Sequence, residues 1–285
     1  MPSIVTQTTR PDGNVSLHID LASFEAPMKE ALRRAAIFLG YAFHSGKVAP
    51  LKSVTLNSSV VLDVGVPDTI PPNNRRIYQT EFRQWATGQG LIEIDQSYHR
   101  YVVSALDTLA DVEDFLQGQA LQDQRKPNLA NTWKVHEKFY ATIQQRSPEH
   151  DNESLYLRSL GNARNCLAHD GGAVTRRRMV DGNQTMVVRW PGHDMEIVDQ
   201  NGVRAILPRD RSFRVRKRDI GSQLNHVKVI REYNYAEGDQ IILSETDLSE
   251  IIFFYQIPAM KVGGEMHRIV REKIVECNTS SSLKS

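Results

Sequence analysis

The longest helical pattern in the chain is the stretch Arg75–Gln119, RRIYQTEFRQWATGQGLIEIDQSYHRYVVSALDTLADVEDFLQGQ. Its apolar residues recur at spacings that place them on one face of an α-helix. These residues are Ile77, Phe82, Trp85, Leu91, Ile92, Tyr98, Val102, Leu106, Leu109, Val112 and Leu116. The pattern predicts one very long helix or two helices end to end. Because glycine is a poor helix former, Gly88-Gln89-Gly90 is the expected break or kink.

Further helices are predicted on both sides of this stretch. Apolar residues with the same periodicity cover Ala22–His44, Leu129–Gln145, Asn152–Gly172 and Thr246 to about Cys277. The last of these segments contains Pro258 and Gly263-Gly264, which are possible interruptions. The connection Ser45–Asn74 is expected to be irregular, with one short extended piece at Ser59–Val64.

The region Thr175–Ser244 contains three turn signals, each between two strand-like runs. The signals are Asp181-Gly182-Asn183 between RRRMV and TMVVRW, Asn201-Gly202 between MEIV and VRAIL, and Glu237-Gly238-Asp239 between VKVIREYNY and QIILS. They predict three hairpins in a small antiparallel sheet. The expected fold class is therefore mainly α (α+β). Residues 1–285 would form a single domain, a helical bundle with a β-rich insertion over residues 175–245 before its last helix.

Composition indicates a folded chain without a global charge excess. The 285 residues are 40% apolar and carry a formal net charge of +1, so a nucleic-acid partner can only be argued from local patches. The two cysteines, Cys166 and Cys277, are too few for a disulfide framework, which favours the cytoplasm. We expect no secretory leader and no membrane partner, because no run of about 18 apolar residues occurs. Metal-ligand spacings and phosphate-binding glycine loops are also missing, so no metal or cofactor is predicted.

The helix that ends in GNARNCLAHDGG, Gly161–Gly172, has two contrasting faces. At about 100° per residue, its apolar residues form one stripe toward the core. This stripe consists of Tyr156, Leu160, Ala163 and Leu167. The opposite side carries a polar ridge made of Arg158, Asn162, Asn165 and His169, with Arg164 to one side of it. The ridge is either an ordinary solvated helix face or a chemical site.

The residue types on this ridge suit the cleavage of a phosphodiester bond. An imidazole can take a proton from a ribose 2′-hydroxyl, or give one to a leaving oxygen, near neutral pH. A guanidinium can neutralise the charge of the phosphate in the transition state. One helix supplies only one imidazole, so an acid and a base together require a second copy of the chain. A twofold dimer that packs the ridges together would supply it.

The segment Arg164-Asn165-Cys166-Leu167-Ala168-His169, late on a helix and followed by Asp170-Gly171-Gly172, resembles the RNxxxH signature of HEPN domains. These are helical modules of many prokaryotic toxins and antiviral effectors, and the order of the predicted helices is similar as well. The resemblance implies a composite, metal-independent ribonuclease site built from two protomers. It implies that His169 is the acid/base group, that Arg164 binds the phosphate, and that Asn165 orients it.

The same resemblance implies partners and a role. The substrate would be RNA, the active form a homodimer, and the protein a toxin or phage-defence effector with a cognate antitoxin or regulator. Some family members are inactive, so a non-catalytic module for dimerisation or RNA/nucleotide binding is the alternative, and an unrelated helical protein is the third reading. Members that a partner nucleotidyltransferase modifies carry a tyrosine two residues after the histidine, where this chain has Gly171.

A local excess of positive charge lies after the motif. Residues 176–218 contain eleven basic and five acidic residues. Within SFRVRKR, a strand would display Arg214 and Arg216 on one face as a row. Together with Arg158 on the ridge, this row is the predicted RNA-binding surface. The alternative is a solvated sheet face whose charge is compensated by acidic residues.

Overall fold

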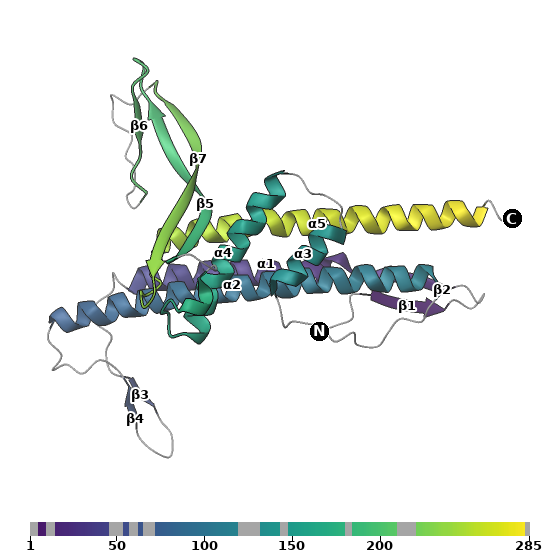
Figure 1. Ribbon diagram of the computed structural model, residues 1–285, viewed down its shortest axis with the longest axis horizontal. Helices are drawn as coiled ribbons and strands as arrows, with labels where there is room; N and C mark the ends of the chain where they lie inside the picture. The colour runs from purple at the N-terminus through teal and green to yellow at the C-terminus, as the bar shows by residue number, and fades with distance from the viewer. Residues whose placement is uncertain are drawn as a thin grey trace.

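A computed structural model describes residues 5–9, 15–45, 54–56, 62–64, 72–118, 132–142, 148–179, 184–209 and 221–282. Its helices are α1 (Leu21–Ser45), α2 (Pro72–Leu116), α3 (Thr132–Thr142), α4 (Pro148–His169) and α5 (Glu245–Ser282). The long helices α1, α2 and α5 lie side by side along the longest axis of the molecule, and α4 crosses them (Figure 1). The expected mainly helical class with a small antiparallel sheet is confirmed.

The strands form three separate antiparallel units. Their bounds are β1 (Val5–Thr9), β2 (Val15–Ile19), β3 (Val54–Leu56), β4 (Leu62–Val64), β5 (Thr185–Val198), β6 (Arg204–Ile206) and β7 (Gln223–Ala236). The hairpin of β1 and β2 was not predicted. In the three-stranded sheet β5 lies between β6 and β7, and β5 pairs with β7 from Thr185↔Ala236 to Val198↔Gln223. The two long strands form a ribbon that projects from the helices (Figure 1).

One of the three predicted hairpins is confirmed, because the turn at Asn201-Gly202 joins β5 to β6. The first hairpin is wrong in its leading strand, because Arg176–Arg178 forms a 3-10 turn, η1. The side chains of Arg177 and Arg178 pair with Asp170, directly after α4, instead of extending a sheet. The third is wrong in its second strand, since after Gly238 the chain makes only the bridge Ala173↔Gln240 before α5 begins. The turn residues 181–183 lie outside the described residues.

The expected break in α2 does not occur, and its glycines serve close packing instead. A Cβ atom on Gly88 would lie 3.2 Å from the Leu167 Cδ2 atom of α4, and one on Gly90 would lie 2.5 Å from the Leu248 Cδ2 atom of α5. The missing side chains therefore let two helices approach α2 on different sides of the same turn, while burial of apolar surface offsets the lower helix propensity of glycine.

Helix α5 is also uninterrupted, although it contains Pro258. Its start is fixed by a capping box: the Ser244 amide donates to Asp247 Oδ2 (2.9 Å), and the Asp247 amide donates to Ser244 Oγ (3.1 Å). Farther along, a Cβ atom on Gly263 would lie 3.0 Å from Glu25 Oε1 of α1, so this glycine again marks a close approach of helices.

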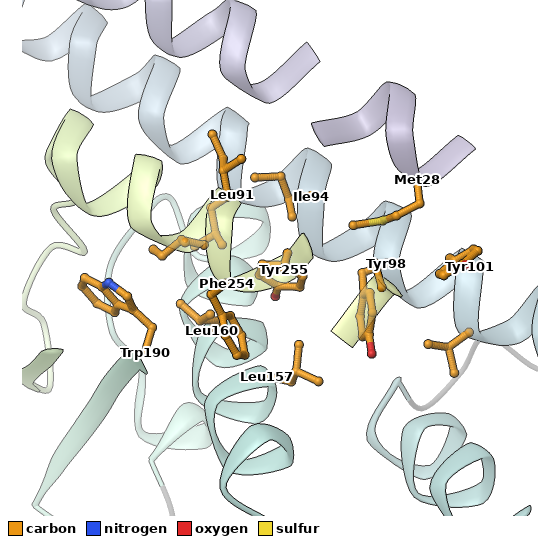
Figure 2. Packing of buried hydrophobic residues seen from close by; sticks show 14 of the residues in the cluster. Met28, Leu91, Ile94, Tyr98, Tyr101, Leu157, Leu160, Trp190, Phe254 and Tyr255 are labelled. Carbon is orange, nitrogen blue, oxygen red and sulfur yellow. The ribbon is translucent and has the colours of Figure 1, made fainter. Parts of the chain in front are cut away.

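Buried side chains from all three long helices, α4 and the sheet form one core (Figure 2). Met28 comes from α1, Tyr98 from α2, Leu160 from α4, Trp190 from β5 and Tyr255 from α5, and each is almost completely buried. Because Trp190 lies in this core, the first half of the ribbon is an integral part of the helical packing.

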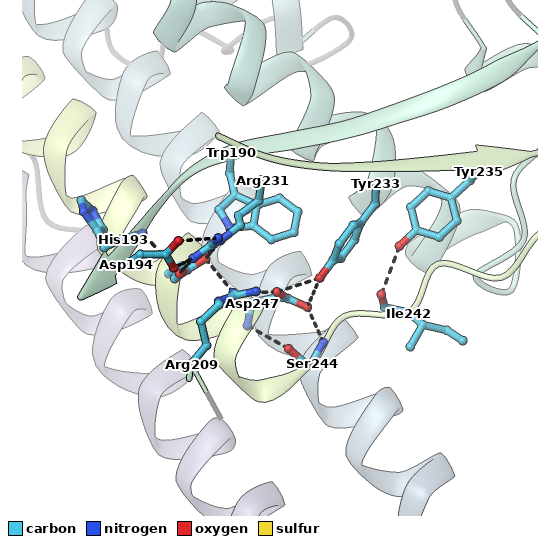
Figure 3. Close-up of polar contacts among 11 residues, drawn as sticks. Trp190, His193, Asp194, Arg209, Arg231, Tyr233, Tyr235, Ile242, Ser244 and Asp247 are labelled. Carbon is cyan, nitrogen blue, oxygen red and sulfur yellow. Dashed lines mark hydrogen bonds and ion pairs between the residues drawn. The ribbon is translucent and has the colours of Figure 1, made fainter. Parts of the chain in front are cut away.

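A network of ion pairs fixes the base of the ribbon to the start of α5 (Figure 3). Arg231 of β7 binds Asp194 of β5 and Glu250 of α5, and Arg209 binds Asp247 (3.0 Å). Hydrogen bonds from Arg231 to Glu250 and Asp194 outweigh the effect of burial and raise the pKa of the Arg231 guanidinium. The ribbon and α5 are thus joined by charged contacts close to the core.

Candidate functional site

The predicted site residues lie on the last turns of α4, which a glycine pair terminates. Gly171 and Gly172 have φ values of 64° and 85°, in the left-handed region that favours glycine. The Gly172 amide donates to the Cys166 carbonyl oxygen at 2.9 Å, which satisfies a carbonyl group of the last turn and closes the helix.

The polar ridge faces outward in the structure. Arg158 and His169 are exposed, whereas Asn162 and Asn165 are partly buried. On the core side Leu160, Ala163 and Cys166 are buried, and Tyr156 and Leu167 pack against the edge of the core. The exposed ring of His169 makes no hydrogen bond to any residue that the structure describes.

Arg164 occupies a different place, because it turns away from the ridge toward α2. Its Nε atom donates to Asp95 Oδ2 at 2.9 Å and its Nη1 atom to Asn165 Oδ1 at 2.7 Å. The side chains of Arg164 and Asp95 are 12% and 3% exposed. The other Asp95 oxygen accepts from the Tyr255 hydroxyl at 2.8 Å. The guanidinium is thus fixed, and Nη2 has no partner within the described part of the chain.

Arg164 and His169 do not converge within one protomer. Five residues along an α-helix correspond to a rotation of about 140°, so the two side chains leave α4 in different directions. A site that uses both on the same phosphate therefore needs groups from a second copy, or a substrate that bends around the end of α4.

Asp95 and two buried histidines near the motif were not identified from the sequence. His99 lies one turn after Asp95 on α2, and its Nδ1 and Nε2 atoms have no hydrogen-bond partner among the residues that the structure describes. Burial lowers the pKa of His99, against the opposing effect of Asp95. His136 of α3 lies next to it, with ring centroids 5.7 Å apart, and burial together with His99 lowers the pKa of His136 to about 3. The sequence signal that could have found them is the four-residue spacing of Asp95 and His99, which places both side chains on one face of a helix.

These histidines predict a loss of stability in acid. The folded-state pKa of His136 lies below its unfolded value, so the unfolded chain binds the proton more readily. The free energy of unfolding should fall by roughly 2 to 3 kcal/mol between pH 7 and about pH 4.5 through this group alone. Urea unfolding at several pH values measures it. His136→Phe should flatten the dependence, whereas Phe139→Leu, a change at a buried neighbour without a titratable group, should lower stability equally at each pH. An unchanged slope in His136→Phe would contradict this expectation.

The predicted RNA-binding pair Arg214 and Arg216 lies outside the described residues. On the described part of the sheet, Arg189 pairs with Glu232 and Arg204 with Glu196. The charge of this surface is therefore largely compensated by acidic partners. Within the described ranges, no three His, Cys, Asp or Glu side chains are grouped to hold a metal ion.

Comparison with known proteins identifies no relatives: no family model, no curated protein and no solved structure matches this chain. Among the described helices, none has a stretch long and apolar enough to span a bilayer. The functional argument therefore rests on the geometry of α4 and its surroundings.

Proposed function

We propose that the protein is a metal-independent endoribonuclease whose active site is completed when two copies associate along the α4 ridge. The observation that carries the proposal is an exposed His169, without a hydrogen bond to the described residues, five residues after an Arg164 whose guanidinium Asp95 holds in place. A histidine for proton transfer and an oriented cation for the phosphate are the two groups that cleavage by a ribose 2′-hydroxyl requires.

In this reaction His169 removes the proton from the 2′-hydroxyl, whose oxygen forms a bond to phosphorus. The bond from phosphorus to the 5′-oxygen breaks, and the partner's His169 gives that oxygen a proton. The products are a 2′,3′-cyclic phosphate and a 5′-hydroxyl. The free Nη2 atom of Arg164 would donate to a phosphate oxygen, and Asn165 contributes by orienting the guanidinium through its Oδ1 atom.

An exposed aromatic surface on α2 supports association beside this site. Trp85 is 61% exposed, its ring centroid lies 6.0 Å from that of Phe82, and Phe82 is also exposed. Trp85 precedes by one turn Gly88, which packs against Leu167 of α4. Exposed apolar clusters of this kind commonly mark protein contacts. A second copy seated there would lie near the last turns of α4.

The test is cleavage of total RNA by the wild-type protein in excess EDTA, over a dilution series of the protein. We expect cleavage that survives the chelator and leaves 2′,3′-cyclic phosphate ends. Because the site is shared between two copies, the specific activity should rise with protein concentration until the dimer is saturated. Cleavage that occurs only with a divalent metal would contradict the proposal.

A non-catalytic module for dimerisation or for binding RNA or a nucleotide is the second candidate. The Asp95–Arg164 ion pair favours it, because a buried pair of this kind also serves as a purely structural link between α2 and α4. RNA binding without cleavage at any protein concentration would support this module.

As a ribonuclease, the protein would act as a toxin or phage-defence effector, held in check by a cognate antitoxin or regulator.

A further inference from the structure

We infer that η1, the turn Arg176–Arg178, binds the RNA backbone by contacting phosphates that flank the scissile one. This inference rests on the proposed function, and it names the surface by which that site holds its substrate. In this inference the RNA backbone is bound by the three guanidinium groups of η1, next to the end of α4, instead of by the predicted pair Arg214 and Arg216.

The position of η1 follows from one aspartate. Asp170 comes directly after His169 and accepts hydrogen bonds from Arg177 and from Arg178 Nε, the latter at 3.1 Å. Its side chain is only 4% exposed, so the two arginines cover it. Consecutive Cα atoms are about 3.8 Å apart, and the arginine side chains are therefore anchored at the residue next to the proposed acid/base group.

The backbone around η1 is held on two sides. The Val174 amide donates to the Asp239 carbonyl oxygen (2.8 Å), and the Gly238 amide donates to the Val174 carbonyl oxygen (2.9 Å). Within the turn, the Arg178 amide donates to the Thr175 carbonyl oxygen at 2.8 Å. The arginines thus extend from a segment tied to both α4 and the connection between β7 and α5, which fixes where a bound phosphate would lie.

Charge is left over on this turn after the internal pairs are formed. The turn carries three guanidinium groups, of which Arg177 and Arg178 share the carboxylate of Asp170, so about two positive charges are left over. The Arg177 side chain is 63% exposed, and Arg176 is exposed with no side-chain partner among the residues described. In contrast, Arg231 on the ribbon and Arg209 after β6 both pair with the carboxylate of Glu250 on α5. Arginine forks match phosphate oxygens well, so this surplus fits the RNA backbone.

The experiment measures binding of a labelled single-stranded RNA by fluorescence anisotropy in the His169→Ala background, where cleavage is removed. Arg176→Gln with Arg177→Gln should weaken binding about tenfold or more near 100 mM salt. If two phosphate contacts are lost, the slope of log affinity against log salt should become shallower by about 1.4. Asp170 keeps Arg178 as a partner in this variant, so the turn is retained.

Arg271→Gln is the matched control, since Arg271 is exposed on α5 about 40 Å from the first residue of that helix. It should leave affinity and salt slope unchanged. Equal affinity and equal slope for the double variant and its parent would overturn the inference, whether or not the wild-type protein cleaves RNA. The binding measurement therefore decides it independently of the proposed activity.

Cleavage kinetics, measured in protein that retains His169, distinguish an effect of η1 on RNA binding from an effect on the chemical step. The double variant should raise KM for a long RNA and leave kcat unchanged, because its contacts are the same in the ground state and the transition state. A dinucleotide carries only the scissile phosphate and should be cleaved as fast as by the wild type. A lower rate on the dinucleotide would show that η1 acts in the chemical step, which would contradict a purely flanking role.

Discussion

His169→Ala should lower the rate of RNA cleavage by about a thousandfold. A positioned acid/base group contributes roughly 10²–10⁴ to a rate, and in a shared site the substitution removes this group from both copies. Stability should be unchanged, because the ring is exposed and makes no hydrogen bond to the described residues. Single-turnover cleavage in excess EDTA measures the rate, and urea unfolding measures the stability.

The matched control for this substitution is His44→Ala, which removes another exposed histidine at the last turn of α1. It should cleave at the wild-type rate. Undiminished cleavage by His169→Ala would remove this residue from the chemistry, whatever the control shows. Equal losses in both variants would point to a general effect on the protein rather than to a catalytic residue.

Asp95→Ala should destabilise the protein by about 3 to 5 kcal/mol and abolish cleavage. The substitution leaves the partly buried Arg164 without its counter-charge and the Tyr255 hydroxyl without its acceptor. Asp95 acts through Arg164, so it is a positioning residue. Asp95→Asn keeps the shape of the side chain and an acceptor for the Tyr255 hydroxyl, so it should lower the free energy of unfolding less than Asp95→Ala. It still removes the charge that orients Arg164, so cleavage should be lost as well. Urea unfolding and single-turnover cleavage measure the two effects.

Tyr255→Phe separates the two contacts of Asp95. It removes only the hydroxyl, so the free energy of unfolding should fall by about 1 kcal/mol, and Arg164 should keep its ion pair.

A double-mutant cycle of Asp95→Asn with Arg164→Gln should show a coupling free energy of about 1 to 3 kcal/mol. Additive losses would show that the pair is not coupled, and the oriented guanidinium would then lose its physical basis.

The helices were the most predictable part of the fold because their signal is local. Periodic apolar residues identified α1, α2, α4 and α5 correctly, since each helix buries one face against the others. The error at Gly88 and Gly90 arose because helix propensity is a local quantity, whereas their role is set by Leu167 and Leu248, which are distant in sequence. The reason for two glycines in one helix becomes visible only when the neighbouring helices are placed.

Strand pairing was less predictable than strand location. The runs that became β5 and β7 were recognised, yet each was assigned to a hairpin with its nearest neighbour, whereas the two pair with each other over their full lengths. The β1–β2 hairpin was missed although Asp12-Gly13, a turn signal, stands between its strands. Short strands carry little periodic signal, so such units depend on the turn chemistry alone.

In the candidate site, too, features set by local sequence were predicted and features set by distant residues were not. The outward ridge of α4 follows from helical geometry and was predicted. The orientation of Arg164 was not, because it depends on Asp95, which is 69 residues away in sequence. Arg176–Arg178 was read as the start of a strand, since nothing in three arginines and a methionine shows that Asp170 would bind two of them.

The bond between Tyr255 and Asp95 joins residues that are 160 positions apart. During synthesis, the ribosome would therefore release α2 and the complete α4 motif well before α5 can supply Tyr255 to the carboxylate that orients Arg164. Helix α5 also supplies a large part of the buried core, so the packing that holds the Asp95–Arg164 pair is complete only when α5 has emerged. The proposed activity would therefore arise only after translation has passed α5, which separates synthesis of the motif from its action.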